Sequence, residues 1–421
     1  MSKKTLGIII DFRQLHNYVS NNKLFLKKFS ENFKELIFID ANAMQKGRNS
    51  AFWDTEVHVY HETYSVTKNR DGFLENLEKL LPLNYELFEP KNLMEFDEFL
   101  KKNTIYLITN LDRAFKNFGI FFKLKKNKIK QFIISNKSVQ NNKGLELNNL
   151  FKKLSLFFKK RIQQKIYSLL CMINIFNKVE IRFDSNLKIY NWWKKNQKQK
   201  KIFFWKKTYY KKLVTINSLA YDESILTNLE ISNDYIVMID ANVNHKDDVS
   251  TRGLLKKETE DKHYALLNKH LEHLSKIYKK EVIVCIHPQY DLKKTQKYFQ
   301  NFKVFKHRTR EFIYKSFLVV FYDSSSIIDA FLLKKNIISL KPDFDWSNDC
   351  TIYNKDFGIV FLDITKEDER KIEEKKLTEN LDIAKINYKK FINTYIKPEI
   401  DPELDNDELG VDVVVKTIKE C

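Results

Sequence analysis

Short unbroken apolar runs recur along the chain, separated by longer stretches in which apolar residues return every three or four positions. The runs predict strands buried on both faces of a parallel sheet, and the stretches between them predict helices. We expect strands at 6–10, 36–39, 57–60, 104–109, 131–135, 235–239, 281–286, 303–305, 317–322, 336–340 and 359–362. We expect helices at 24–34, 73–81, 111–118, 258–279, 292–299, 309–315, 326–333, 366–396 and 411–419.

The alternation of strands with helices predicts βαβ units and parallel sheets. A basic, aromatic-rich segment interrupts it, and the rhythm restarts near residue 233. We therefore predict the α/β class, with two Rossmann-like domains and a basic helical insert. The expected boundaries are an N-terminal α/β domain over 1–150, an insert or linker over 151–230 packed on it, a C-terminal α/β domain over 231–397 and a tail over 398–421.

The apolar content of the chain is high enough for a core, and its net charge favours an acidic partner. Apolar residues make up 43% of the 421 residues, and the formal net charge is +19. Such a charge favours nucleic acid, an anionic membrane surface or a phosphorylated substrate. Part of the lysine excess is equally consistent with codon bias, since Asn, Ile and Phe are also abundant.

Most of the positive charge lies in residues 151–212, which hold eighteen Lys and Arg and only two acids, Glu180 and Asp184. Pairs of aromatic residues such as Trp192-Trp193 stand between the lysines. Trp and Tyr rings sit at the headgroup depth of a bilayer, where cations meet anionic lipid. We therefore expect 151–212 to dock on an anionic membrane. Nucleic-acid binding is the less favoured interpretation, and a solvated insert whose aromatics face the core is a third.

Other sequence signals bear on location. No run of 18 apolar residues predicts a membrane span, and the start of the chain has no apolar secretory region. The four cysteines form no CxxC pair, which argues against a zinc ribbon or redox motif. We expect a cytoplasmic protein, peripheral on the inner face of the membrane.

Two polar runs directly follow predicted strands in the last third of the chain. His287-Pro288 follows 281–286, and Ser324-Ser325-Ser326 follows 317–322. Ligands of open α/β sheets gather at the carboxyl ends of strands, and a serine-rich helix start offers N–H groups to a phosphate. An ordinary N-cap is the alternative for the serines.

These runs predict one nucleotide pocket in the second domain. His287 is suited to act on a leaving phosphate, because imidazole titrates near neutral pH. Arg310 and Lys341 lie near the two runs along the chain and are expected to neutralise the leaving group.

Carboxylates that follow strands are candidate general bases. Asp240 ends the strand at 235–239 and begins a polar cluster with Asn242, His245, Asp247 and Asp248. We take Asp240, Asp247 and, in the first domain, Asp11 as the candidates, with Asp40 and Asp112 as rivals. A loop cap or a cation ligand is the alternative for this cluster. No set of metal ligands and no GxGxxG or GxxxxGK[ST] motif occurs, which argues against dehydrogenase and P-loop functions.

Over roughly residues 233–345 the chain resembles GT-B glycosyltransferases, in particular bacterial enzymes that use CMP-activated sialic acid or Kdo. Those families carry an HP motif and a later SS or SSS motif, like His287-Pro288 and Ser324-Ser325-Ser326 here. In them the histidine and serines contact the CMP phosphate. The run 322–330 is also similar to polymerases that use CDP-glycerol. The families' acidic D-D/E-G motif has only Asp247-Asp248-Val249 as its counterpart, so the base stays open.

The resemblance implies two Rossmann-like domains facing each other across a cleft, with the donor held by the second. It implies inverting, metal-independent sugar transfer from a CMP-linked donor to a bacterial surface glycan or glycolipid, without a further cofactor. One alternative is a CDP-glycerol-type polyol phosphotransferase. The other is a non-catalytic adaptor that binds membrane or nucleic acid through 151–212.

Overall fold

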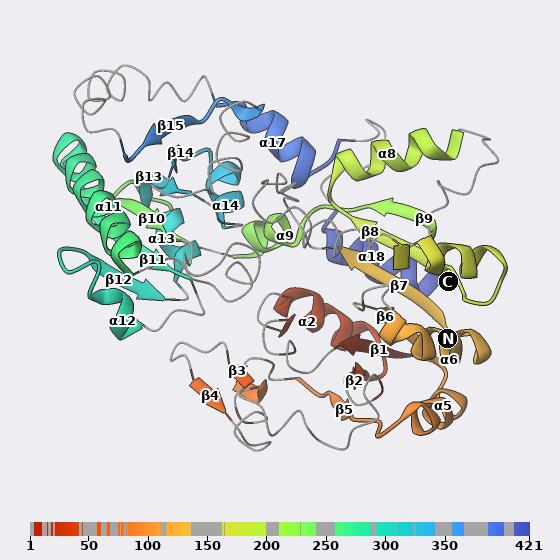
Figure 1. Cartoon of the computed structure of the whole chain (residues 1–421). Coiled ribbons are helices and arrows are strands. Elements are labelled where there is room, and N and C mark those ends of the chain that lie inside the picture. The colour runs from red at the N-terminus through yellow and green to blue at the C-terminus, as the bar shows by residue number, and fades with distance from the viewer. Residues whose placement is uncertain are drawn as a thin grey trace. The chain divides into compact units, whose positions relative to one another are not determined.

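The chain divides into two compact units (Figure 1). Unit 1 combines Met1–Lys137, Phe151–Asp222 and Lys397–Cys421, and unit 2 combines Ser138–Leu150 and Glu223–Ile396. The computed structural model describes residues 4–10, 15, 18–19, 22–41, 44, 57–59, 65–67, 75, 77–79, 81, 83–109, 111, 115–135, 162–163, 165–198, 210–227, 229–240, 257–287, 292–306, 308–322, 324, 326–341, 356–365, 386–399 and 408–421.

Unit 1 is built on a seven-stranded parallel sheet in the order β5-β2-β1-β6-β7-β8-β9. All residues of β1 and β2 are buried, which explains why these strands are continuous apolar runs. Leu6 and Ile8 face one core cluster, whereas Ile9 faces the other. The strands are β1 (Thr5–Ile10), β2 (Leu36–Asp40), β5 (Glu86–Phe88), β6 (Ile105–Thr109), β7 (Lys130–Ser135), β8 (Val179–Asp184) and β9 (Tyr210–Thr215).

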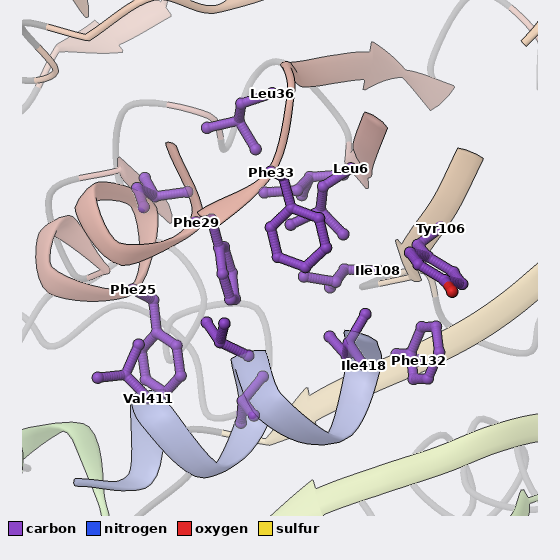
Figure 2. Close-up of a cluster of buried hydrophobic side chains, with 14 of the residues drawn as sticks. Leu6, Phe25, Phe29, Phe33, Leu36, Tyr106, Ile108, Phe132, Val411 and Ile418 are labelled. Carbon is purple, nitrogen blue, oxygen red and sulfur yellow. The ribbon is translucent and has the colours of Figure 1, made fainter. Parts of the chain in front are cut away.

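Helices cover both faces of this sheet. α2 (Lys23–Asn32) and α18 (Gly410–Glu420) pack on the face of Leu6 and Ile8, and Figure 2 shows Phe25 of α2 beside Val411 of α18. The opposite face carries α5 (Leu93–Lys102), α6 (Phe118–Lys126), a helix over 165–172 and α8 (Leu187–Lys198). Right-handed crossovers account for this division, because the connections from β5 through to β9 run opposite to the connection from β1 to β2.

The last residues of the chain complete unit 1. The buried Asp222 of α9 (Leu219–Leu226) accepts hydrogen bonds from the backbone N–H groups of Gly410 at 2.9 Å and Val411 at 2.8 Å, and so caps α18. A Cβ atom at Gly410 would lie 2.2 Å from the carbonyl oxygen of Asn217, so glycine is required there. The helix expected at 411–419 is confirmed, and its apolar face packs in the core of unit 1.

Unit 2 contains a six-stranded parallel sheet in the order β12-β11-β10-β13-β14-β15. Its strands are β10 (Tyr235–Ile239), β11 (Glu281–Ile286), β12 (Lys303–Lys306), β13 (Ser316–Phe321), β14 (Asn336–Lys341) and β15 (Val360–Asp363). Its helices are α11 (Lys257–Tyr278), α12 (Leu292–Gln296), α13 (Thr309–Tyr314), α14 (Ile327–Leu332) and α17 (Tyr388–Tyr395). The prediction of two Rossmann-like α/β domains is confirmed.

Several expected elements differ from the structure. The segment expected as a helical insert supplies β8 and β9 to the sheet of unit 1, together with α8. The strand expected at 57–60 lies in a separate antiparallel pair, β3 (Val57–Val59) with β4 (Ser65–Thr67). The helix expected at 111–118 is instead α6, preceded by a 3-10 turn at Phe115–Asn117. Residues 366–385 of another expected helix lie outside the described residues.

Candidate functional site

The carboxyl edge of the unit 2 sheet is the place where polar side chains gather. From β10 the chain passes through α11 to β11 on one side, and it later enters β13 on the other side of β10. The strand order therefore reverses between β10 and β13, which makes this edge the topological switch point of the sheet. Ligands of open α/β sheets bind in the crevice at such points.

Asp240 directly follows the central strand, β10. Its backbone N–H donates to the carbonyl oxygen of Cys285 at 2.9 Å, and its neighbour Ile239 pairs with Phe321 of β13. Asp240 is 2% exposed, and the phenol of Tyr322 donates a hydrogen bond to its Oδ1 atom. The two strands that flank the switch point are thus tied together by one side-chain hydrogen bond.

The first half of α11 encloses this pair. His263 and Tyr264 are both buried, and the ring of His263 lies edge-on to the ring of Tyr322 with the centroids 5.7 Å apart. Burial raises the pKa of Asp240 to about 7, against hydrogen bonding by Tyr322 and Tyr264, and the nearby charge of Glu260 adds to the rise. This carboxyl group therefore exchanges its proton near neutral pH.

Asp240 is suited to orient its neighbours. A carboxyl group with 2% exposure has little surface through which to take a proton from a sugar hydroxyl directly. Its hydrogen bond instead fixes Tyr322, the residue that starts the turn toward the serines. The other two candidate bases, Asp247 and Asp11, lie outside the described residues, as do the rival Asp112 and the cluster members Asn242, His245 and Asp248.

Ser324 and Ser326 stand at the end of β13, beside Asp240 across the switch point. The Ser324 hydroxyl accepts a hydrogen bond from the Ser326 backbone N–H at 3.2 Å, which closes the turn before α14. The Ser326 side chain makes no capping bond to α14. Both serines are partly exposed, so the turn is open to a ligand. Ser325 lies outside the described residues.

His287 stands on the other side of β10. It follows β11 by one residue and is partly exposed, whereas Pro288 lies outside the described residues. Lys306, the last residue of the adjacent strand β12, is 8% exposed, and sequence reasoning missed it. The carboxyl edge therefore presents, in strand order, Lys306, His287, Asp240 and the serine turn.

Arg310 and Lys341 are placed differently from this group. Arg310 of α13 forms ion pairs with Glu223 of α9 and, at 3.2 Å, with Asp329 in the first turn of α14. Burial raises the pKa of Asp329 to about 6, although the charge of Arg310 opposes the rise. Two carboxylates thus balance the guanidinium, which anchors α14. Lys341 ends β14, two strands from β10 and opposite Asp363 in register.

The carboxyl edge of unit 1 carries a different arrangement. Asp184 ends β8 and is 1% exposed, and Arg182 donates to its Oδ2 through Nη2 at 2.6 Å and Nε at 3.0 Å. The backbone N–H of Asn186 donates to the remaining oxygen at 3.0 Å. The switch point of this sheet lies between β1 and β6, so Asp184 stands away from it. Asp40, at the end of β2, is buried as well.

Sequence reasoning also missed His263 and Tyr264. Their signal was present, since His263, Leu267, His270 and Leu274 lie on one face of α11, four and three positions apart, and all are buried. A histidine in the apolar stripe of a helix is a signal of a buried polar contact. Within the part of the chain that the structure describes, no three His, Cys, Asp or Glu side chains converge as a metal site.

No protein-family model and no curated protein sequence matches the chain. Solved structures match at low identity over nearly its whole length. The UDP-GlcNAc 2-epimerase from Methanocaldococcus jannaschii is 12% identical with a TM-score of 0.52, and the match covers 99% of this chain and 100% of that one. The S. aureus MnaA structure with UDP is 12% identical with a TM-score of 0.50, covering 99% and 96%. A variant of the wall teichoic acid polymerase TagF is 11% identical with a TM-score of 0.50, covering 99% and 89%.

These matches show the fold, which is of the GT-B type with two Rossmann-like domains.

Proposed function

We propose that this chain is a glycosyltransferase that moves a sugar from a nucleotide-activated donor to an acceptor hydroxyl. The observation that carries the proposal is the switch point of the unit 2 sheet, where His287, Asp240 and the Ser324–Ser326 turn follow three adjacent parallel strands. The GT-B fold of the whole chain supports it, and solved structures named for UDP or UDP-GlcNAc have the same fold.

Each group has a role in this proposal. The hydroxyl groups of Ser324 and Ser326 bind the donor phosphate, and His287 with Lys306 stabilises the charge that develops as the phosphate leaves. Asp240 holds Tyr322 and so positions the serine turn. Arg310 positions α14 through Asp329.

The reaction is inverting and independent of metal in this proposal. A carboxylate, Asp247 or Asp11, takes the proton of the acceptor hydroxyl while the hydroxyl oxygen attacks the anomeric carbon. The bond between that carbon and the phosphate oxygen breaks, and the nucleotide leaves with the electron pair.

The donor is CMP-linked in this proposal, because His287-Pro288 and the three serines match the motifs of CMP-sugar enzymes. The acceptor is a bacterial surface glycan or glycolipid. The second candidate is a CDP-glycerol-type polyol phosphotransferase. It is favoured by the stretch Tyr322 to Ala330, and the wall teichoic acid polymerase has the same fold.

The test is a ligand screen on the purified chain. We expect CMP to raise the melting temperature by several degrees, with UDP and GDP giving smaller shifts, and CMP-linked sugars to release CMP only when an acceptor is present. The double variant Ser324→Ala, Ser326→Ala and the variant His287→Ala should each lose the shift and at least about tenfold in turnover. The matched control is Ser232→Ala, a serine at the amino edge of the same sheet, which should behave as wild type.

Other outcomes separate the candidates. Turnover with CDP-glycerol alone would establish the phosphotransferase, and interconversion of UDP-linked sugars without transfer would indicate an epimerase. If none of the nucleotides shifts the melting temperature, the non-catalytic adaptor is favoured. Wild-type CMP binding in the serine double variant would place the donor elsewhere.

A further inference from the structure

The two faces of the unit 1 sheet differ in what they expose. Thirteen large apolar side chains are exposed among the described residues, and nine of them lie in or beside the helices of the α5–α6–α8 face. The face of α2 and α18 contributes none among its described residues. The nine are Met94, Phe115, Phe122, Ile162, Leu169, Met172, Ile173, Ile175 and Trp192.

Five of these side chains belong to one packed pair of elements, α6 with the helix and turn over 165–176. Phe118 of α6 lies 5.1 Å, ring to ring, from Phe176, and Phe121 lies 4.9 Å from Tyr167. The ammonium of Lys125 donates to Asn174 at 2.7 Å, which ties α6 to the turn. These inward contacts leave Phe122 and the turn residues on adjacent outward surfaces.

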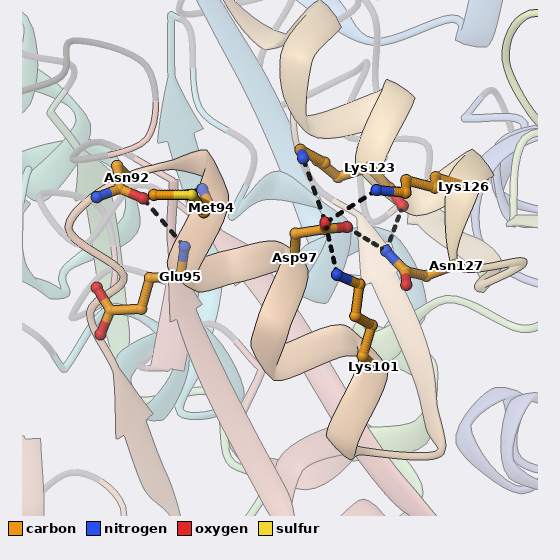
Figure 3. Close-up of polar contacts among 8 residues, drawn as sticks. All are labelled: Asn92, Met94, Glu95, Asp97, Lys101, Lys123, Lys126 and Asn127. Carbon is orange, nitrogen blue, oxygen red and sulfur yellow. Dashed lines mark hydrogen bonds and ion pairs between the residues drawn. The ribbon is translucent and has the colours of Figure 1, made fainter.

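The same layer is strongly basic. The stretches 115–130, 162–178 and 187–198 contain twelve lysines and no acidic residue. On the neighbouring α5, Asp97 is shared by Lys101, Lys123 and Lys126 at 3.2–3.3 Å and by Asn127 at 2.7 Å, as Figure 3 shows. One carboxylate cannot neutralise three ammonium groups, so positive charge remains in excess there.

The two adjacent tryptophans of α8, Trp192 and Trp193, face different surroundings. Lys188, Asn191, Trp192 and Lys195 are exposed at the three- and four-residue spacing of a single helix face. Trp193 turns the other way and packs with the β8–β9 cluster. The structure thus separates the aromatic residue that serves the core from the one that faces solvent.

The chemistry of the layer fits lipid better than nucleic acid. Single-stranded nucleic acid is held by aromatic rings on which bases stack, whereas most of the exposed apolar residues here are Ile, Leu and Met. Aliphatic side chains enter the acyl boundary of a bilayer, and lysines reach past them to anionic headgroups.

We propose that α6, the 162–176 segment and α8 together form a docking surface for an anionic lipid bilayer. The surface goes beyond the sugar-transfer chemistry and does not depend on it. Compared with the docking segment 151–212 that the sequence predicts, this surface also includes α6, and it leaves out Trp193. In the described residues no helix is both long enough and apolar enough to cross the bilayer, so the proposal is surface docking.

Flotation of the full chain with liposomes tests the proposal. Wild type should float with vesicles that contain phosphatidylglycerol and not with pure phosphatidylcholine, and the bound fraction should fall as salt rises. The variant Lys188→Glu, Lys195→Glu should lower the partition coefficient at least about tenfold. The matched control is Lys27→Glu, Lys34→Glu on or next to α2 of the opposite face, which should retain most binding.

A second pair tests the apolar part. Phe122→Ser with Ile173→Ser should weaken binding several-fold, whereas Ile231→Ser with Leu292→Ser, which changes exposed residues of unit 2, should leave it unchanged. Melting curves confirm that each variant is folded. The proposal is overturned if wild type ignores anionic vesicles, if the control pairs lose as much binding, or if a single-stranded oligonucleotide displaces the vesicles completely.

Discussion

Two buried carboxylates occupy comparable places in the two sheets and have opposite surroundings. Asp184 ends a parallel strand of unit 1 at 1% exposure, and Asp240 follows one of unit 2 at 2%. Asp184 receives a forked pair of hydrogen bonds from Arg182. Asp240 is held by the phenol of Tyr322, and the charge that lies near it among the described residues is that of Glu260 rather than a cation.

The difference indicates a structural role for Asp184 and a functional role for Asp240. Burial raises the pKa of Asp184, although the charge of Arg182 opposes the rise, and the removal of such a paired acid costs stability. A buried acid that lacks a cation has its pKa moved into the physiological range, which is common at functional sites. Asp240 also stands at the switch point of its sheet, whereas Asp184 does not.

The largest loss of stability is expected for Asp184→Asn. The substitution leaves the partly buried Arg182 against a neutral amide, so we expect the free energy of unfolding to fall by about 3 kcal/mol. Urea denaturation measures the loss. The double variant Arg182→Met, Asp184→Asn should recover much of it, because no charge is then left unpaired. A double variant no more stable than the single one would contradict the ion-pair explanation.

A pH-dependent effect is expected for Asp240→Asn. The pKa of Asp240 is raised in the folded protein from 3.8 to about 7. The native state therefore keeps a proton that the unfolded chain loses, and stability falls as pH rises from about 4 to about 7. Asparagine stays neutral, so the variant should match wild type near pH 4 and exceed its stability by about 2–4 kcal/mol at pH 8.

Unfolding curves at pH 4, 6 and 8 measure this difference for Asp240→Asn. Asp261→Asn, which removes an exposed carboxylate from α11, serves as the control for the change in net charge. A constant difference for Asp240→Asn would show that its carboxyl group titrates normally.

The smallest effect is expected for Asp97→Asn. Hydrogen bonding by Asn127 and the three lysines holds the pKa of Asp97 well below its usual range, although burial opposes this. Its contribution is therefore present above the ordinary carboxyl pKa and is lost only as the pH falls below it. We expect a loss of about 1 kcal/mol at pH 7 that shrinks in 1 M salt. Glu75→Gln, which breaks the exposed pair with Lys79, should change stability less.

Much of the fold could be predicted from sequence because parallel strands buried on both faces are continuous apolar runs. β8 escaped prediction because its buried Val179, Ile181 and Phe183 alternate with polar residues inside a lysine-rich stretch. α5 escaped because acids and lysines interrupt its apolar stripe.

The site was predictable only in part. Residues that directly follow strands, such as His287 and Ser324, could be found by reading along the chain. The partners of Arg310 could not, because Glu223 lies 87 positions away and comes near only in the folded unit. The contact between His263 and Tyr322 likewise depends on how α11 packs, which local periodicity does not specify.

The cap that Asp222 places on α18 has a consequence for how the chain is made. Domains usually fold in order from the N-terminus as they are synthesised. Here the apolar face of Val411, Val414 and Ile418 fills the core beneath α2, near the beginning of the chain. Synthesis of unit 1 therefore begins first, but its core is completed last. A ribosome that stops before residue 410 releases a protein that has all the residues of unit 2 but lacks the helix that completes the core of unit 1.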